Sequence, residues 1–323
     1  MRATAPASIG NFGPGIDIMG AAVRGPADSV VADWTDADGV VVLDAGHPDL
    51  PRGAERHASA IAAAEVLRLA ALLGVRGRST GLALTVRKGL PLAGGQGGSA
   101  ASAVAGALAT NALLGDVLDT HALLLACLTA EERLAGRHLD NLAPSLLGGI
   151  VLIRSLDPLD VVRLPVPQTL LIVLAHPEQR LRTADARAVL PRSVERGVAL
   201  HQSAQVAAVV AALHTGDLAL LGRAFDDRIA EPVRAGLLPG FTEAKRAALA
   251  AGALGCAISG AGPTSFAIVD DPESGSRVAD AMGVAYRSRG IACDVRVAPI
   301  DERGAWVERA GAAGVPDAAD ATR

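Results

Sequence analysis

The feature that most constrains this sequence is a glycine-rich run between residues 89 and 102, GLPLAGGQGGSAAS, in which Gly94, Gly95, Gly97 and Gly98 fall within five positions. Sequence typical of a helix follows at once, over 99–114. A flexible main chain that leads into a helix start presents unpaired amide groups and the positive end of a helix dipole. We predict a polyphosphate-binding loop rather than a plain linker, because linkers seldom open onto a long apolar helix.

Two common nucleotide motifs do not describe this run. A P-loop requires a lysine followed by serine or threonine, and no such pair occurs in the chain. The dinucleotide fingerprint fits residues 95–100 only in its variant that ends in alanine. Residues 87–91 separate the run from the preceding apolar strand, which also lies far from the chain start. The sequence therefore favours phosphate binding without a dehydrogenase fold.

Composition narrows the class of protein. Half of the 323 residues are hydrophobic but only 2% are aromatic, so the core must consist of Ala, Val, Leu and Ile. A net charge of −4 with interspersed signs argues against a nucleic-acid partner. No apolar run approaches 18 residues and the N-terminus lacks a signal-peptide core, so we expect a cytoplasmic protein that does not enter a membrane. Cys127, Cys256 and Cys293 are expected to be reduced core residues.

Patterning predicts strands and helices in irregular order, which is typical of an α+β protein with two lobes. The expected strands are 29–34, 40–43, 82–86, 150–154, 170–175, 256–259, 265–269 and 293–297. The expected helices are 54–73, 99–114, 119–134, 193–213, 217–228, 241–251 and 274–289. Residues 157–167, with three prolines, are expected to cross between the lobes. We predict an N-terminal domain over 1–156, a C-terminal domain over 157–310 and a disordered tail over 311–323.

Polar residues gather in two further segments. Residues 5–20 are predicted to form a tightly turned loop that holds Asn11 and Asp17, although both could simply cap turns. Residues 131–149 carry Glu131 and then a cluster that precedes a proline and a double glycine, namely His138, Asp140 and Asn141. A carboxylate beside a triphosphate suits Mg²⁺, which takes one or two protein oxygens and completes its shell with phosphates and water. The alternative is that Glu131 and its neighbour Glu132 form a solvated helix face.

A second glycine turn, Ile258-Ser-Gly-Ala-Gly-Pro-Thr-Ser-Phe266, lies between two apolar strands. By itself it is a weak signal, since many hairpins look similar. In combination and in this order, the N-terminal segment, the glycine run and this turn resemble the three motifs of the GHMP kinase superfamily. Residues 138–144, 183–191, 229–234 and 238–241 are similar to its homoserine kinase family in particular, and the likeness extends from about residue 5 to residue 297.

The resemblance implies a two-lobed fold, with an N-terminal nucleotide-binding lobe, a C-terminal ferredoxin-like lobe and the active site between them. It implies ATP-dependent phosphorylation of the side-chain hydroxyl of L-homoserine on the route to threonine. ATP would be bound by the loop and by the late turn, at Pro91, Leu92, Ala93, Gly94, Gly95, Gln96, Gly97, Gly98, Ser99, Ala100, Ala101, Gly260 and Gly262. Ser99 and Glu131 would hold Mg²⁺. Members are often dimers, so a homodimer is also expected, although nothing in the chain locates its interface.

The same resemblance implies a site for a zwitterion. Arg187 and Arg234 match a clamp for the substrate carboxylate, to which a planar guanidinium binds bidentately. The alternative is a pair of solvated surface arginines. The amino group and the remainder of the substrate would meet Asn11, Asp17, His138, Asp140 and Thr183. Asn141 matches the residue beside the reacting hydroxyl, and because an amide cannot take a proton, the hydroxyl is expected to attack directly.

The glycine run departs from the family at two positions. Gly98 replaces the first of two serines, and Gln96 replaces an apolar leucine. The second serine is kept as Ser99. We expect reduced or unaltered activity, because Gly98 keeps its backbone amide. Two other functions remain open at this point, namely a GHMP-type kinase for another small alcohol and a non-catalytic relative that binds a nucleotide or an amino acid.

Overall fold

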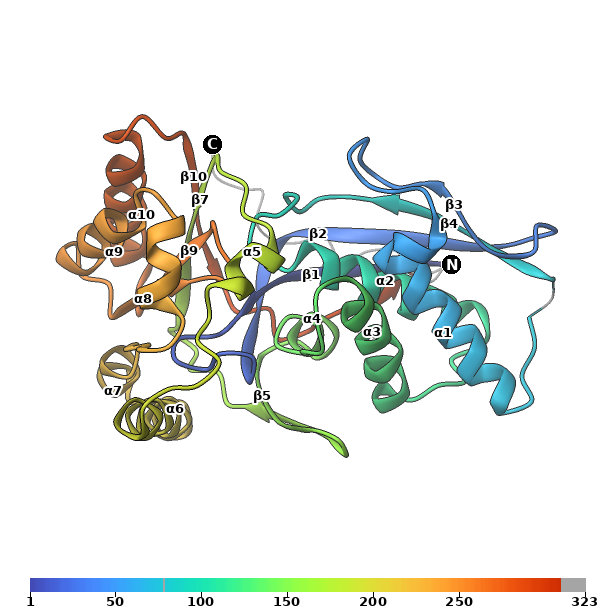
Figure 1. Ribbon diagram of the computed structural model, residues 1–323, viewed down its shortest axis with the longest axis horizontal. Coiled ribbons are helices and arrows are strands. Elements are labelled where there is room, and N and C mark those ends of the chain that lie inside the picture. The colour runs from blue at the N-terminus through green and yellow to red at the C-terminus, as the bar shows by residue number, and fades with distance from the viewer. Residues whose placement is uncertain (78, 309–323) are drawn as a thin grey trace.

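The computed structural model describes residues 1–77 and 79–308, which form two β-sheets with helices packed on them (Figure 1). The first sheet has seven strands, and most of them come from the N-terminal half of the chain. Its order is β11-β1-β2-β4-β3, with β5 paired to the start of β2 and β6 paired to β5. The strands are β1 (Arg2–Gly10), β2 (Met19–Thr35), β3 (Gly39–Asp44), β4 (Gly81–Arg87), β5 (Ile150–Leu156), β6 (Leu159–Leu164) and β11 (Trp306–Glu308). Among the strands that the structure describes, only β3 and β4 pair in parallel.

The first strand corrects the prediction of a loop over 5–20. Residues 2–10 form β1, in the interior of the sheet between β11 and β2, and the turned segment is confined to residues 11–18. The strand has few β-branched residues and contains Pro6, so its local sequence does not indicate a strand. The ladder to β2 is irregular at Pro6 and Ala7, which is where a proline without an amide hydrogen is tolerated. Pairing on both sides overrides the weak propensity.

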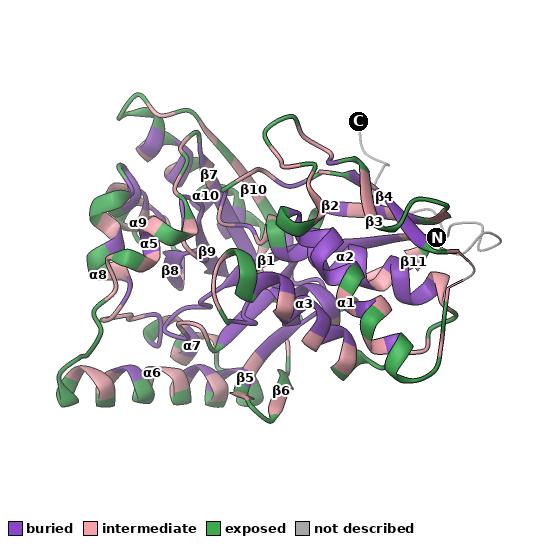
Figure 2. Cartoon of the chain, turned by 45° about the vertical axis from the view of Figure 1, so that its right-hand side comes forward, coloured by how far each residue is buried: buried purple, intermediate pink, exposed green. Residues whose placement is uncertain are grey.

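Helices cover one face of the first sheet. They are α1 (Ala58–Leu72), α2 (Gly98–Leu113), α3 (Thr120–Leu134) and the short α4 (Leu142–Leu147), preceded by the 3-10 turn Ala54–Arg56. Asp119, the first residue of the predicted helix 119–134, caps α3 by accepting a hydrogen bond from the Ala122 amide at 2.8 Å. The core here consists of Ala, Val, Leu and Ile together with Cys127, and Figure 2 shows α2 largely buried. Small side chains let these helices pack closely and hold the start of α2 firmly.

The second sheet has the order β10-β7-β9-β8 and is entirely antiparallel. Its strands are β7 (Leu171–Pro177), β8 (Gly255–Ile258), β9 (Ser265–Val269) and β10 (Cys293–Pro299). The helices of this half are α5 (Thr183–Ala188), α6 (Arg196–Thr215), α7 (Leu218–Arg223), α8 (Glu231–Arg234), α9 (Phe241–Ala250) and α10 (Pro272–Arg287), with a 3-10 turn at Ala235–Leu237. The strand order 4-1-3-2 within this sheet is the ferredoxin-like arrangement, which confirms the expected two-lobed α+β fold.

Two stretches cross the predicted domain boundary at residue 156. Residues 159–164, expected as part of a crossover, instead form β6, which pairs with β5 as a hairpin of the first sheet. Near the end of the described chain, β11 returns to pair with β1. The crossover prediction is therefore wrong over β6, because residues 159–164 pair antiparallel with β5 and extend the sheet. The predicted boundaries themselves stay a prediction, and the expected disordered tail, 311–323, lies outside the described residues.

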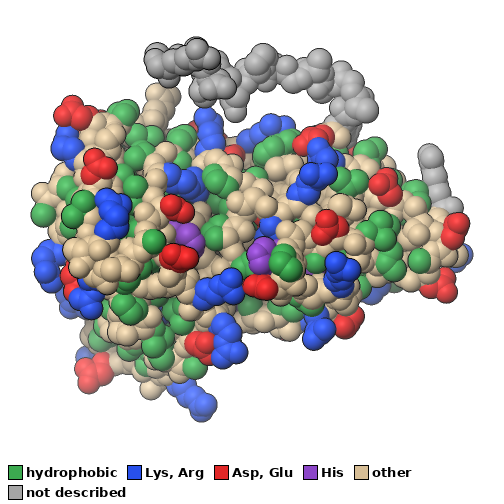
Figure 3. All heavy atoms as spheres, turned by 90° about the horizontal axis from the view of Figure 1, so that it is seen from above, with side chains coloured by type: hydrophobic (Ala, Val, Ile, Leu, Met, Phe, Trp, Pro, Cys, Tyr) green, Lys and Arg blue, Asp and Glu red, His purple; other side chains and the backbone are tan. Residues whose placement is uncertain are grey.

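Smaller differences also have local causes. The predicted helix 217–228 ends at Arg223, and α4, α5 and α8 are short helices that periodicity does not reveal. Cys127 and Cys256 are buried and free, as expected, but Cys293 is only half-buried because β10 is an edge strand. Charges of both signs are interspersed on the face seen in Figure 3. None of the helices within the described ranges is long and apolar enough to span a membrane.

The two lobes share a core. Phe12, from the turn after β1, stacks on Phe266 of β9 with ring centroids 5.6 Å apart, and Phe225 meets both rings edge-on. These are three of the four phenylalanines in the chain. Aromatic contacts of this kind fix relative orientation as well as burying area. The turn formed by residues 11–18 is thereby held against the second sheet. As a result, Asn11 lies beside the late glycine turn.

Candidate active site

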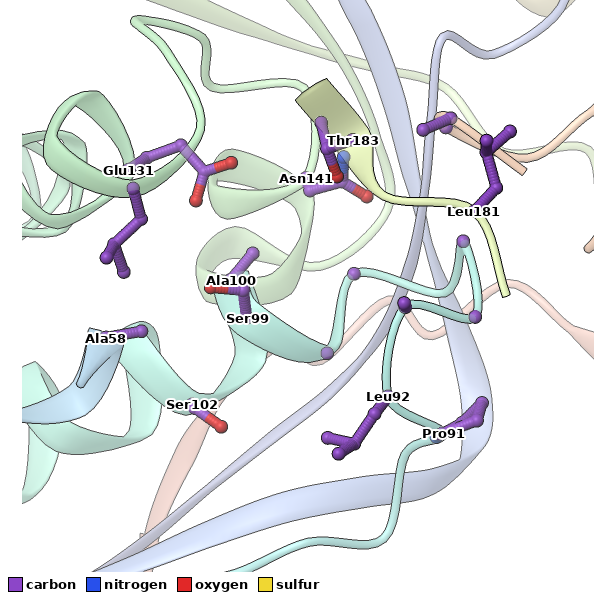
Figure 4. A pocket seen from close by; sticks show the side chains of 18 of the residues that line it. Ala58, Pro91, Leu92, Ser99, Ala100, Ser102, Glu131, Asn141, Leu181 and Thr183 are labelled. Atoms are coloured by element: carbon purple, nitrogen blue, oxygen red, sulfur yellow. The ribbon is translucent and has the colours of Figure 1, made fainter. Parts of the chain in front are cut away.

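A cavity of about 370 Å³ lies between the two lobes. It is bordered by the glycine loop and the start of α2, by α3 and the segment before α4, and by α5 and the turn after β8. Most of the predicted site residues line it, namely Asn11, Pro91, Leu92, Ala93, Gly94, Gly95, Gly97, Gly98, Ser99, Ala100, Glu131, His138, Asp140, Asn141, Thr183, Arg187, Arg234, Gly260 and Gly262. Figure 4 shows Glu131 reaching in from α3 toward the region of Ser99 and Asn141.

The carbonyl groups of the glycine loop are bound on the side away from the cavity. The Gly94 oxygen accepts hydrogen bonds from the Thr264 amide and hydroxyl, and the Gly95 oxygen accepts from the Ser259 hydroxyl. The Gln96 oxygen accepts from the Ser8 amide at 3.2 Å. In a planar trans peptide the carbonyl and the following amide point in opposite directions. The amides of residues 95–97 are therefore turned toward the cavity.

The loop runs into the N-terminus of α2 without a side-chain cap. Gly97 is the N-cap and has φ +67°, a left-handed conformation that glycine adopts without strain. Among the described residues, no hydrogen bond is donated by the amides of residues 95–100, whereas the Ala101 amide donates to the Gly97 oxygen at 2.8 Å. A run of free amides at a helix N-terminus is an anion-binding arrangement.

A buried lysine braces this arrangement. Lys88, one of only two lysines in the chain, forms an ion pair with the fully buried Asp28. Its ammonium also donates to the Gly98 oxygen at 2.8 Å and to the Ser102 hydroxyl at 3.0 Å. Asp28 in turn accepts from the amides of Gly89 and Leu90. The group fixes both ends of the glycine loop and places a cation at the edge of the cavity.

Three titratable side chains are buried together on the α3 side. His138 Nδ1 lies 3.4 Å from Glu131 Oε1 and 3.6 Å from Asp140 Oδ1. Burial, reinforced by the charge of Asp140, raises the pKa of Glu131 to about 8, while Arg187 acts in the opposite direction. Burial also raises the pKa of Asp140, which the His138 charge opposes. A carboxylate with a pKa near 8 is poised to ionise when a cation approaches.

The turn after β1 connects this group to the opposite lobe. The Asn11 amide donates to Asp140 Oδ2 at 3.0 Å, and its side chain donates to the Gly260 oxygen at 2.9 Å. Asn11 Oδ1 accepts from the Asp17 amide at 2.8 Å. Asn141 Oδ1 accepts from the Ser8 hydroxyl at 3.0 Å. Asn11 is therefore the organiser of the turn as well as a cavity residue.

The two arginines enter from the second lobe. Arg234, on α8, is 2% exposed and donates from Nη1 to the Gly260 oxygen at 2.9 Å and from Nε to the Ala186 oxygen at 3.2 Å. Burial lowers the pKa of Arg234, and the charge of Asp17 opposes that shift. Arg187, on α5, pairs with Asp17. These arginines are not solvated surface residues, so that alternative is excluded.

Buried polar atoms without a hydrogen-bond partner concentrate at this cavity. In the described part of the chain they are His57 Nε2, His138 Nδ1, His138 Nε2, Asp140 Oδ1 and Arg187 Nε. All belong to residues that line the cavity. Leaving a buried polar group unsatisfied costs roughly 1–3 kcal/mol, so native proteins rarely tolerate such groups away from ligands. The cavity is therefore built for a polar ligand.

Comparison with known proteins agrees with this geometry. Residues 58–149 match the GHMP kinases N terminal domain, and residues 209–287 match the GHMP kinases C terminal region. A homoserine kinase of Arabidopsis thaliana is 40% identical over 88% of this chain and 78% of its own length. One from Chlorobium phaeobacteroides is 37% identical over 94% of this chain and 98% of its own.

The chain belongs to the homoserine kinase family of the GHMP kinases. The crystal structure of a homoserine kinase from Cytophaga hutchinsonii has the same fold, with a TM-score of 0.89 and 39% identity over 95% of this chain and 97% of that one.

Three predicted site residues lie outside the cavity wall. Asp17 does not line the cavity, but it contacts Arg187 and Asn11, which do. The Gln96 side chain borders a second cavity behind the loop. Ala101 is fully buried and its amide is already used, so it does not fit the predicted contact with nucleotide. Gly260 contributes its carbonyl to Asn11 and Arg234, which places the late turn beside the predicted substrate residues.

The sequence reasoning missed one wall of the cavity and its bracing lysine. Residues 50–58 contribute Leu50, Pro51, Arg56, His57 and Ala58. They lie before and at the start of α1, where no motif marks them. Lys88 had a usable signal, since a lysine directly before a glycine loop is notable in a chain whose other basic residues are almost all arginine.

Proposed function

We propose that this protein transfers the γ-phosphoryl group of ATP to the side-chain hydroxyl of L-homoserine, within the cavity between its lobes. The observation that carries the proposal is that one cavity has a phosphate-binding type of surface at one end and an amino-acid-binding type of surface at the other. Free amides at a helix N-terminus suit phosphates, and two guanidinium groups with an adjacent carboxylate suit an amino acid. A mevalonate or galactose site would not require both an acidic and a doubly basic anchor.

The nucleotide is assigned to the loop and to the α1 side of the cavity. The amides of residues 95–100 would bind the phosphates, with Lys88 contributing charge. The nucleoside would lie against the largely apolar wall of Leu50, Pro51 and Ala58, where His57 Nε2 has no partner among the described residues. A wall of apolar side chains with one precisely directed polar atom is typical of sites that orient a base.

The donor set fits a magnesium ion bound with the nucleotide. Ser99 and Glu131 line the same cavity. Within the described ranges, no group of three or more His, Cys, Asp or Glu could hold a metal ion, so phosphate oxygens of the nucleotide would have to supply further ligands. Mg²⁺ usually takes one or two protein oxygens together with phosphate oxygens and water, and it neutralises charge on the transferring phosphoryl group. Glu131 would supply the carboxylate, in its ionised form.

The amino acid is assigned to the α5 and α8 side. Arg187 and Arg234 would bind its carboxylate, and Arg187 Nε is a buried donor without a partner among the described residues. Asp17 would pair with the ammonium group. Thr183, His138 and Asp140 border the space that remains between these anchors and the loop. This order leaves the hydroxyl end of the substrate directed toward Asn141 and the phosphates.

Asn141 would orient the attacking hydroxyl rather than deprotonate it. An amide has no proton-accepting role at neutral pH, and phosphoryl transfer passes through a loose transition state that depends mainly on alignment and charge neutralisation. Asn141 is held by Ser8 at 3.0 Å, so its position is fixed by β1. As the new O–P bond forms and ADP leaves, the hydroxyl proton would pass to a phosphoryl oxygen or to solvent. The homodimer expected from the family and the cytoplasmic location expected from the sequence both stay predictions.

The direct test is ADP release by purified protein with Mg²⁺-ATP and a panel of homoserine, threonine, mevalonate and galactose. Turnover with homoserine well above the other alcohols is expected. Turnover with mevalonate and none with homoserine would instead support a GHMP-type kinase for another small alcohol. Nucleotide binding without turnover of any alcohol would support the non-catalytic relative.

A further inference from the structure

We propose that Gln96 and Arg296 are positioning residues that hold the phosphate-binding loop from behind and thereby set its affinity for ATP. Neither side chain lines the cavity assigned to the substrates. Both border a second cavity of about 740 Å³ on the opposite side of the loop. The inference rests on the proposed function, because it takes the loop as the nucleotide-binding element.

A continuous chain of hydrogen bonds connects β2 to the loop through these residues. Arg296, on β10, donates from Nη1 to the Arg24 oxygen at 2.8 Å and from Nη2 to Gln96 Oε1 at 3.2 Å. Gln96 Nε2 donates to the Thr264 hydroxyl at 3.4 Å. The Thr264 hydroxyl then donates to the Gly94 carbonyl oxygen. The chain thus joins both lobes and ends on the loop itself.

The directions of these bonds are fixed by chemistry. An arginine can only donate, so the oxygen of the Gln96 amide faces Arg296 and its nitrogen faces Thr264. The Thr264 hydroxyl has a single hydrogen, which goes to Gly94, so His176 Nδ1 at 2.9 Å must be a donor to the same oxygen. Every group in the chain has a defined role, and a change at one end removes a partner at the next.

Arg296 has no carboxylate partner among the described residues. Its contacts are two neutral oxygens, and burial lowers the pKa of its guanidinium to about 10. Arg296 is only half-buried, but its guanidinium is held by hydrogen bonds to an oxygen of β2 and to an oxygen of the loop. The role that the geometry offers is to bridge β2 and the loop, which a shorter or singly donating side chain could not do as well.

The hydrogen-bond chain acts on the cavity through the peptide group between Gly94 and Gly95. When the Gly94 oxygen is held by Thr264, the Gly95 amide points the opposite way, toward the phosphates. The family loop has leucine where this chain has Gln96, and leucine cannot join such a chain. Gln96 therefore gives this loop hydrogen bonds that the family's leucine cannot make, in the same loop in which Gly98 replaces the family's first serine.

The experiment is calorimetric titration of Mg²⁺-ATP, without homoserine, into the wild type and the variants Gln96→Leu and Arg296→Met. Each variant is expected to raise the ATP Kd about ten-fold, while the KM for homoserine changes less than about two-fold. The double variant is expected to be no weaker than the worse single variant, because both cut one chain. Arg296→Lys should recover part of the loss. Arg163→Met is the matched control, since Arg163 donates to the Glu302 oxygen at 3.1 Å, far from the loop.

Several results would overturn the inference. An unchanged ATP Kd in Gln96→Leu and Arg296→Met would do so, as would effects that multiply in the double variant. An equal rise in the ATP Kd and in the KM for homoserine, together with a lowered Tm, would show that both residues have only a structural role. If the wild type itself does not bind Mg²⁺-ATP, the proposed function fails first, so the two failures are distinguishable.

Discussion

Asp17 and Arg187 form a two-point ion pair at the edge of the candidate active site, with Arg187 Nη2 2.6 Å from Asp17 Oδ1 and Nη1 3.3 Å from Oδ2. Asp17 belongs to the turn after β1, and Arg187 to α5 of the other lobe. The carboxylate of Asp17 therefore lies where the carboxylate of an amino acid would bind Arg187. A zwitterion can replace this pair without leaving either charge alone, because it offers a carboxylate to Arg187 and an ammonium to Asp17.

This relationship predicts strong coupling between the two charges of the substrate. A ligand that lacks the ammonium, such as 4-hydroxybutyrate, would leave Asp17 unpaired beside its own carboxylate. Asp17→Asn is expected to weaken homoserine binding and to reduce discrimination against 4-hydroxybutyrate by about ten-fold. The measurement is the KM of homoserine and the inhibition constant of 4-hydroxybutyrate in both proteins.

The matched control is Asp185→Asn, which removes a similar bidentate pair to Arg182, at 2.8 and 2.9 Å, on the exposed side of α5. It should leave both constants unchanged. If Asp17→Asn weakens the two ligands by the same factor, Asp17 does not recognise the ammonium group.

Two adjacent glycines of the loop should respond very differently to alanine. A Cβ on Gly97 would lie 2.0 Å from Ser8 Oγ, and its φ of +67° disfavours any side chain. A Cβ on Gly98 meets nothing closer than 3.3 Å, at the Pro91 oxygen. Gly97→Ala is expected to cost roughly 1–3 kcal/mol and to weaken Mg²⁺-ATP binding at least ten-fold. Gly98→Ala should stay within about three-fold of the wild type. Calorimetry and Tm measure both, and comparable losses at the two positions would refute this account of the loop.

Glu131 should make stability depend on pH in the absence of metal and nucleotide. Its pKa is raised in the folded state, so the folded protein binds the extra proton between pH 4.5 and about 8, and stability falls as the pH rises through that range. Each pKa unit corresponds to ~1.4 kcal/mol. With EDTA present, Glu131→Gln is expected to raise the Tm by about 5 °C at pH 9 and to change it little at pH 5.

The neighbouring Glu132→Gln is the control, because Glu132 is exposed on the same helix. A Tm difference between Glu131→Gln and the wild type that is the same at both pH values would show that Glu131 does not titrate in this range.

The sequence was sufficient to predict the parts of the site that carry their own local signal. The glycine loop is followed by a helix, and Asp119 caps α3, because both depend on residues within a few positions. The strand β1 could not be predicted in this way. Its alanines and Pro6 gain their strand conformation from partners in β2, from Val30 opposite Ala3 to Val23 opposite Ala7, and from β11 near the end of the described residues.

The same distinction holds within the active site. Glu131, Arg187 and Arg234 line the cavity, which agrees with the motifs in which they occur. The ion pair between Arg187 and Asp17 joins residues 170 positions apart, and no local motif indicates it. The wall at residues 50–58 depends on how the segment before α1 returns to the cavity, and composition says nothing about that. Gln96 was expected on the nucleotide side, yet its side chain bonds to Arg296 and Thr264, which are distant in sequence and come from the other lobe.

The most direct test of the central claim is the steady-state kinetics of Arg187→Ala with each substrate varied in turn. If Arg187 binds the carboxylate of homoserine while the glycine loop binds ATP, the KM for homoserine should rise about 100-fold and the KM for ATP should change less than two-fold. A similar rise in both KM values, or no change in the KM for homoserine, would contradict the assignment of the two ends of the cavity.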